Sequence, residues 1–245
     1  MEGKEARFGI ENAGLSLAVA SDSGTGSSNF TYDSLTPLGG LTALVNMELG
    51  EVVFGGVGSG LYGILVFAVL AVFIAGLMVG RTPEYLGKRI ERREVQFAMI
   101  AILVFPAVIL VATAIAVLIP QGTVTLTNAG PHGFTEVLYA FVSVASNNGS
   151  AFAGLGPNLF YEIATVVVMV GGRFLVMVPT LALASCLAAR PTNDRGHAGA
   201  FSTDNAFFAV ILIAVIVLVG ALTFLPADLL GPIAEHFVLR QGRTF

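Results

Sequence analysis

Charged residues are scarce in this chain of 245 residues, in which Asp, Glu, Lys and Arg together make up 11%. Soluble domains carry about 25% charged residues. Hydrophobic residues make up 55% of the chain, and its mean hydropathy is +0.84. The shortage of charge therefore excludes an ordinary soluble domain. It predicts an all-α integral membrane protein that crosses the lipid bilayer several times.

Cysteine and catalytic patterns are also missing or nearly so. Cys186 is the single cysteine, so the chain offers no disulfide framework and no cysteine metal cluster. We find no Ser-His-Asp, Cys-His or paired-carboxylate arrangement and no nucleotide-binding motif. We therefore expect no catalytic residue, no organic cofactor and no nucleic-acid partner. The histidines, His132, His197 and His236, lie outside the long apolar segments, and we expect all three in solvated loops.

Long apolar segments predict four membrane-spanning helices, since crossing the hydrocarbon core takes about 20 apolar residues. These segments are residues 61–80, 97–119, 158–188 and 206–225. Seven basic residues lie in the two loops between them, namely Arg81, Lys88, Arg89, Arg92, Arg93, Arg190 and Arg195, against four near the chain ends. By the positive-inside rule, we expect these two loops on the cytoplasmic side.

Two shorter apolar stretches are each followed by a polar loop that contains glycine. Residues 133–144 precede the polar run 143–154, and residues 1–20 precede the polar run 21–34. Neither apolar stretch is long enough to cross a bilayer. Irregular backbone at membrane depth is tolerated where it is enclosed by protein or lines an aqueous cavity. There its carbonyl groups can replace the hydration shell of a cation. The repeated pattern predicts two pore loops of a cation-conducting protein.

The tips of these loops hold the candidate ion ligands. They are Thr25, Gly26 and Ser27 in the first loop and Asn147, Asn148, Gly149 and Ser150 in the second. Glycine permits backbone conformations that align carbonyl groups and that most residues resist. The asparagine side chains can brace neighbouring strands.

A glycine-rich run interrupts one apolar region. Residues 41–54 form its first half, and residues 61–80 form its second half. The run between them contains Gly55, Gly56, Gly58 and Gly60, and each glycine costs a helix about 1 kcal/mol relative to alanine. We expect a broken membrane helix, a frequent device in transporters. A phosphate-binding loop is excluded because the Lys-Ser/Thr ending is missing.

Arg173 lies in the middle of the third apolar segment, with no other charged residue near it in the sequence. An arginine at the centre of a membrane helix costs about 2.5–3.5 kcal/mol on insertion scales. We therefore expect Arg173 to face the protein interior, with Glu51 as its natural carboxylate partner and Glu48 as a rival. A fixed positive charge below a cation filter would discourage cations from sliding back.

Eight stretches in order along the chain resemble the family of potassium-binding A subunits of the bacterial Kdp potassium-importing ATPase. They are residues 1–9 (MEGKEARFG), 33–40 (DSLTPLGG), 50–63 (GEVVFGGVGSGLYG), 80–88 (GRTPEYLGK), 131–139 (PHGFTEVLY), 147–155 (NNGSAFAGL), 172–174 (GRF) and 220–224 (GALTF). The resemblance covers nearly the whole chain.

The resemblance implies the fold of the potassium transporter superfamily, with four helix–pore helix–filter–helix repeats around one ion path. Residues 1–90 would form a partial third repeat with its pore helix, filter loop and glycine-broken helix. Residues 91–190 would form the fourth repeat, and residues 191–245 a cytoplasmic loop, the last transmembrane helix and the tail. It also implies a bacterial or archaeal plasma membrane. The implied partners are small accessory subunits and a P-type ATPase catalytic subunit, which binds ATP.

The resemblance also assigns roles to single residues. Potassium would bind to backbone carbonyls near Gly26 and Gly149 in the third and fourth filter strands. Glu51 and Arg173 match charged residues of the potassium path. The glycine run 55–60 resembles an intramembrane gating loop, and Arg93 falls where the family has a conduction-related basic residue.

The sequence departs from the family pattern in two ways. The run 21–26 is more polar than the family's Thr/Ala-rich run and includes Asp22, and Tyr32 replaces a family histidine. The first two repeats and the opening helix of the third are missing, so the chain supplies two filter strands where a filter needs four. We expect a C-terminal half that works with a missing N-terminal half. The alternatives are a homodimeric channel, in which two copies supply four strands, and a nonconducting remnant.

Overall fold

The computed structural model describes residues 7–50, 52, 55–56, 59–150, 152, 155–192 and 202–243. Its helices in chain order are α1 (Ile10–Ser23), the 3-10 turn η1 (Tyr32–Ser34), α2 (Pro37–Glu48), α3 (Ser59–Val79), α4 (Arg92–Leu118), α5 (Pro120–Thr123), α6 (Gly130–Ala145), α7 (Leu159–Ala189), α8 (Ala206–Asp228), the π turn η2 (Leu229–Ile233) and α9 (Ala234–Arg240). Strands β1 (Glu84–Tyr85) and β2 (Lys88–Arg89) form a small antiparallel hairpin between α3 and α4.

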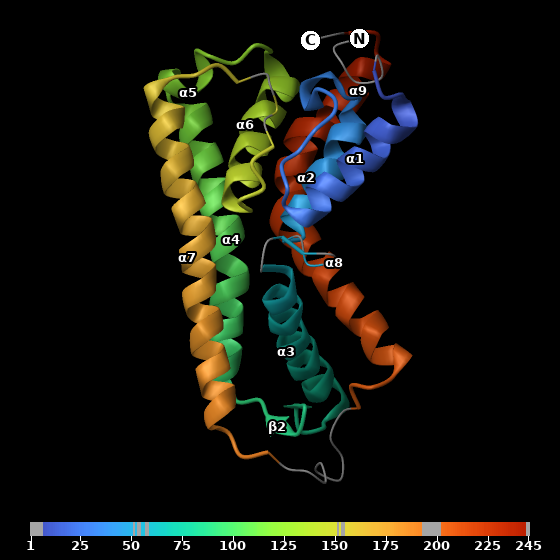
Figure 1. Cartoon of the computed structure of the whole chain (residues 1–245), viewed down its shortest axis with the longest axis vertical. Helices are drawn as coiled ribbons and strands as arrows, with labels where there is room; N and C mark the ends of the chain where they lie inside the picture. The colour runs from blue at the N-terminus through green and yellow to red at the C-terminus, as the bar shows by residue number, and fades with distance from the viewer. Residues whose placement is uncertain are drawn as a thin grey trace.

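Within the described residues, four helices are long and apolar enough to cross a membrane. The spans are Gly60–Val79, Arg92–Leu118, Leu159–Ala189 and Ala206–Arg240. Helices α4 and α7 pack along each other, and α3 and α8 form the opposite side of the molecule (Figure 1). Many large apolar side chains on these helices are exposed, as expected for surfaces that contact lipid. The prediction of an all-α membrane protein with four spanning helices is confirmed.

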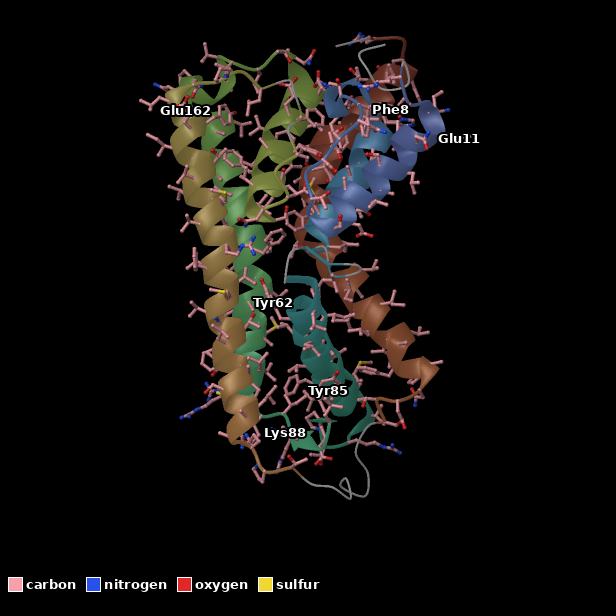
Figure 2. All side chains as sticks on the ribbon, in the orientation of Figure 1. Phe8, Glu11, Tyr62, Tyr85, Lys88 and Glu162 are labelled. Carbon is pink, nitrogen blue, oxygen red and sulfur yellow. The ribbon has the colours of Figure 1, made fainter. Side chains whose placement is uncertain are left out.

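The short helices gather at one end of the molecule and the hairpin lies at the other (Figure 1). Figure 2 labels Lys88 at the hairpin end and Glu11 and Glu162 at the opposite end. Arg190, in the loop after α7, joins the hairpin end by ion pairs of 2.6 Å to Glu91 and 3.0 Å to Glu94. The described parts of the two predicted basic loops therefore lie on the same side of the spans, as the positive-inside rule required.

The break between α2 and α3 begins earlier than the sequence indicated. We predicted an apolar half-helix over residues 41–54, but α2 ends at Glu48. Gly50 has a φ of +80° and its backbone N–H donates to the carbonyl of Met47, so the chain leaves the helix there. Gly60 lies inside α3 rather than in the break, which corrects the predicted boundary at the other side.

An aromatic core lies between the short helices. Tyr32, Tyr139 and Phe152 are buried, and the ring of Tyr139 lies 5.3 Å from that of Tyr32 and 4.7 Å from that of Phe152. Aromatic pairs at such distances contribute about 0.5–1.5 kcal/mol beyond their buried area. This core joins α6 to the segments that follow α1 and α6, and it positions both glycine loops.

Candidate functional site

The two predicted pore loops lie next to each other. The first follows α1 and the second follows α6, so each begins at the C-terminal end of a short helix. The Asn148 side-chain amide donates a 2.8 Å hydrogen bond to the carbonyl of Ala20, near the end of α1. The backbone N–H of Asp33 donates a 3.1 Å bond to the carbonyl of Phe152. Asn148 thus connects the second loop to the end of α1, whereas the sequence analysis suggested that the asparagine side chains brace neighbouring strands.

Gly26 marks the tightest approach between the loops. Its φ is +65°, and a Cβ atom placed on it would lie 2.2 Å from the carbonyl oxygen of Asn148. Both the conformation and the contact therefore require glycine. Gly149 has a φ of +83° but is exposed, and a Cβ atom there would have no neighbour within 4 Å. Glycine at position 149 is required by conformation alone.

The second loop is braced by the preceding helix, α6. The Ser143 hydroxyl donates a 2.8 Å hydrogen bond to the carbonyl of Ser150, and the hydroxyls of Tyr139 and Ser150 lie 2.8 Å apart. The backbone N–H of Ser150 donates to the side-chain oxygen of Asn148 at 3.2 Å. The backbone carbonyl of Ser150, one of the predicted ion ligands, therefore faces α6. Asn147 adopts a φ of +58°, a conformation that asparagine tolerates better than most residues.

The first loop has fewer internal contacts. The hydroxyls of Thr25 and Ser27 lie 3.3 Å apart, and both side chains are exposed. Ser28 forms a short hydrogen bond to the carbonyl of Phe30. The exposed edges of both loops are the places where a backbone carbonyl could meet an ion.

A cavity of about 110 Å³ lies below the loops, between α3, α4, α7 and α8. Arg173, Glu48, Asn147 and Tyr62 are among its lining residues, and Tyr62 is labelled at the start of α3 in Figure 2. A Cβ atom on Gly172 would lie 2.1 Å from the carbonyl oxygen of Ala145, so glycine lets α6 end directly against α7. This contact places Arg173 below the second loop and toward the protein interior, as predicted.

The predicted partners of Arg173 have different outcomes. Glu51 lies outside the described residues, so its pairing with Arg173 stays a prediction. Gly58, from the glycine-rich run, also lies outside them. Glu48 is buried beside the carboxyl group of Asp228, at the end of α8. The sequence analysis missed this carboxyl pair because its members lie on helices far apart in the chain.

The remaining predicted path residues lie in two different places. Gly55 and Gly56 lie in the break between α2 and α3, and Gly55 has a φ of +74°. Arg93 is exposed in the first turn of α4. That turn lies at the hairpin end of the molecule, away from the glycine loops (Figure 1). The structure does not bring Arg93 together with the other predicted site residues.

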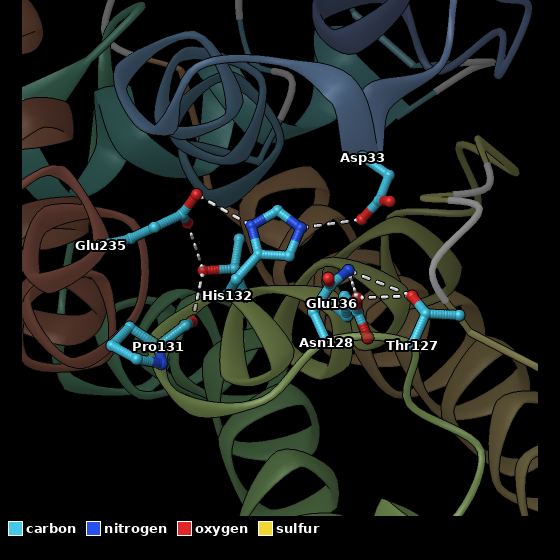
Figure 3. Close-up of polar contacts among 8 residues, drawn as sticks. Asp33, Thr127, Asn128, Pro131, His132, Glu136 and Glu235 are labelled. Carbon is cyan, nitrogen blue, oxygen red and sulfur yellow. Dashed lines mark hydrogen bonds and ion pairs between the residues drawn. The ribbon is translucent and has the colours of Figure 1, made fainter. Parts of the chain in front are cut away.

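The expectation that His132 is solvated is wrong. His132 is only 7% exposed, and its ring lies between two carboxylates (Figure 3). Nε2 lies 2.9 Å from Oδ1 of Asp33, and Nδ1 lies 2.8 Å from Oε1 of Glu235. Burial alone lowers the pKa of His132, but the hydrogen bonds and negative charges of Glu235 and Asp33 raise it to about 9.

A sequence signal for this burial was available. Pro131 occupies the first turn of α6, a position that proline favours at helix starts, and it places His132 on a buried helix rather than in a loop. Of the other histidines, His236 is half-buried in α9, and His197 lies outside the described residues.

Glu136 completes the polar cluster around His132. It is fully buried and accepts hydrogen bonds from Asn128 at 2.7 Å and Thr127 at 3.0 Å. Ligand atoms of Asp33, His132 and Glu136 lie within 4.8 Å of one another, a spacing that a metal ion could use. With its pKa raised to about 9, the His132 ring carries a proton on both nitrogens near neutral pH. The ring then offers no lone pair to a metal ion.

Comparisons with known proteins agree with the sequence resemblance. A family model described as the potassium-transporting ATPase A subunit matches residues 1–237. The potassium-transporting ATPase potassium-binding subunits of Mesorhizobium japonicum and Solibacter usitatus are 54% and 57% identical to this chain. Each alignment covers 100% of this chain and 43% of the relative, so the chain spans less than half the length of these relatives.

Proposed function

Because the chain belongs to the family of potassium-transporting ATPase A subunits, we propose that it binds potassium and conducts it across a bacterial or archaeal plasma membrane. In this proposal it supplies the third and fourth strands of the filter. A second polypeptide segment, matching the part of the relatives that this chain does not cover, supplies the other two strands. A P-type ATPase subunit hydrolyses ATP, and small accessory subunits complete the complex.

The contact between the two glycine loops carries this proposal. Two short helices end at adjacent loops, each with a glycine of positive φ, and the loops meet at Gly26 and Asn148. Such a backbone can present carbonyl oxygens to a dehydrated potassium ion near Gly26 and Gly149. The exposed edge of Thr25, Ser27 and Gly149 would face the rest of the filter.

Below the filter, the cavity beside Arg173 would be the next stage of the path. An ion leaving the carbonyl ligands would enter a space that also holds the fixed positive charge of the guanidinium group. This charge would raise the energy of a cation in the cavity and limit its residence there. The break that contains Gly55 and Gly56 borders the same region and would act as the gate.

Growth at low potassium tests the proposal. The chain would be expressed with and without the complementary segment and the ATPase subunits, in cells unable to grow at micromolar potassium. We expect growth only when all parts are present. Growth with this chain alone would instead indicate a self-assembled channel. No growth in any combination, with the protein inserted in the membrane, would leave a nonconducting remnant.

Two alanine variants provide a matched control for this assay. Gly26→Ala should abolish growth because its methyl group would collide with the Asn148 carbonyl. Gly14→Ala lies inside α1 in open space and should leave growth unchanged. Equal growth of both variants would contradict the assignment of the first loop to the filter.

Substitutions of Arg173 can distinguish an effect of its charge on transport from an effect on folding. We expect Arg173→Ala to change the transport rate while the thermal unfolding midpoint stays near the parent value. Arg173→Lys should retain most of the parent behaviour because it keeps the positive charge. A large fall in the unfolding midpoint of Arg173→Ala, with unchanged transport by the surviving protein, would assign Arg173 a structural role only.

A further inference from the structure

The His132 cluster joins three segments that are distant in the sequence. His132 lies in the first turn of α6, the proposed pore helix of the fourth repeat, Asp33 lies in η1 at the end of the first glycine loop, and Glu235 lies in the terminal helix α9. The ring bridges the other two, with separations of 2.9 Å to Asp33 and 2.8 Å to Glu235 (Figure 3). Charge-assisted hydrogen bonds of this length are about twice as strong as neutral ones.

The cluster is also connected to both glycine loops. The backbone N–H of Asp33 donates to the carbonyl of Phe152 in the second loop. The ring of Phe152 lies 5.9 Å from the ring of His132 and 4.7 Å from that of Tyr139. Displacement of Asp33 would therefore pull on the first loop through the backbone and on the second loop through this hydrogen bond.

From this geometry we propose that His132 is a positioning residue for the filter: its doubly hydrogen-bonded ring holds Asp33 against α6 and α9 and thereby fixes the separation of the two glycine loops. The inference rests on the proposed function in one respect only, namely that the loops form a filter. The positioning itself is a statement about structure. It predicts altered discrimination between ions of similar size, because carbonyl spacing determines which ion is coordinated well.

Carboxyl groups face the ring from three sides. Asp33 reaches it from η1, Glu235 from α9, and Glu136 from the next turn of α6. Thr135 adds a 3.5 Å contact to Glu235. With one imidazolium among three carboxyl groups, replacement of His132 by a neutral residue leaves buried negative charges that repel each other. We therefore expect η1, α6 and α9 to move apart when His132 is replaced.

The separation of the loops can be measured without any transport assay. Spin labels would be attached to the exposed positions Thr36, just before α2, and Pro157, after the second loop, in a Cys186→Ser background. The labelled full chain, assembled with its complementary segment in lipid nanodiscs, would be compared by double electron–electron resonance. We expect His132→Gln to broaden or shift the distance distribution. His236→Gln, on the same terminal helix as Glu235, should leave it unchanged.

Ion discrimination supplies the second readout. In the assembled complex, we expect His132→Gln to change the ratio of apparent affinities for potassium and rubidium by at least about threefold, a free-energy difference of roughly 0.7 kcal/mol. Asp33→Ala should behave similarly. Asp33→Asn keeps an acceptor oxygen and should fall between Asp33→Ala and the parent. A residue that only stabilises the fold would lower the unfolding midpoint without changing this ratio.

The two readouts separate failure of this inference from failure of the proposed function. An unchanged distance distribution in His132→Gln overturns the positioning role, whatever the transport result. A changed distribution in a complex whose parent form shows no response to potassium supports the positioning role and contradicts the proposed function. A changed distribution with an unchanged ion ratio overturns the link between loop separation and discrimination.

Discussion

The two glycine loops come from similar sequence patterns but are held in different ways. The second loop is braced by side chains of α6, since Tyr139 and Ser143 form hydrogen bonds with Ser150. In the first loop, Thr25, Ser27 and Ser28 are exposed, and the loop contacts the second loop at Gly26 and through the backbone N–H of Asp33. The comparison teaches that two segments with a similar sequence pattern can be held in place by different contacts. In this account, the position of the first loop depends on its contacts with the second.

The largest expected effect distinguishes the glycines of the two loops. Alanine at a left-handed position costs about 1–2 kcal/mol, and this cost applies to both Gly26→Ala and Gly149→Ala. Gly26→Ala adds a collision with the Asn148 carbonyl, so its free energy of unfolding should fall further. Unfolding in mixed detergent micelles, followed by circular dichroism, measures both variants. Equal losses would show that the loops do not touch at Gly26.

Removal of the cross-loop amide should weaken the first loop more than the second. Asn148→Ala loses the bond to Ala20 and the bond from the Ser150 N–H. Loss of these buried partners should cost about 1–3 kcal/mol. Hydrogen exchange should accelerate over residues 24–34, while Asn12→Ala, which loses a local bond on an exposed face of α1, should change little. Faster exchange confined to the second loop would reverse the proposed order of dependence.

Removal of one internal brace should have a smaller effect. Tyr139→Phe deletes the hydroxyl that faces Ser150 and retains the ring in the aromatic core. We expect a loss of about 0.5–1.5 kcal/mol in unfolding free energy, with faster exchange in the second loop. Tyr85→Phe, in the hairpin at the other end of the molecule, serves as the control. No difference between the two variants would mean that this brace contributes nothing to the second loop.

A further expected effect is a pH dependence from His132. Its folded pKa of about 9 lies above the ordinary value of 6.5, so protonation stabilises the fold. This stabilisation is complete below about pH 6.5 and is lost as the pH rises through 9. The thermal midpoint of the parent should therefore fall between pH 6.5 and 9.5, and His132→Gln should lack this component. Parallel pH profiles would contradict the charged state of His132.

Hydropathy and glycine placement were sufficient to predict the spans and the loops. Four spans follow from long apolar runs, and the polar runs after α1 and α6 mark the candidate filter. The fine structure depends on contacts that local patterns do not encode. The position of Asp228 beside Glu48 comes from the packing of distant helices. The early end of α2 depends on the positive φ of Gly50. The sequence analysis placed the break at the glycine-rich run 55–60 instead, because that run is the stronger signal.

Ion density between the glycine loops tests the account most directly. The chain would be crystallised in complex with its complementary segment and the ATPase subunits, with thallium in place of potassium, and its anomalous scattering would be recorded. The account predicts a thallium peak within coordination distance of backbone carbonyl oxygens near Gly26 and Gly149. A well-ordered structure that holds thallium elsewhere, with no peak between these loops, would contradict it.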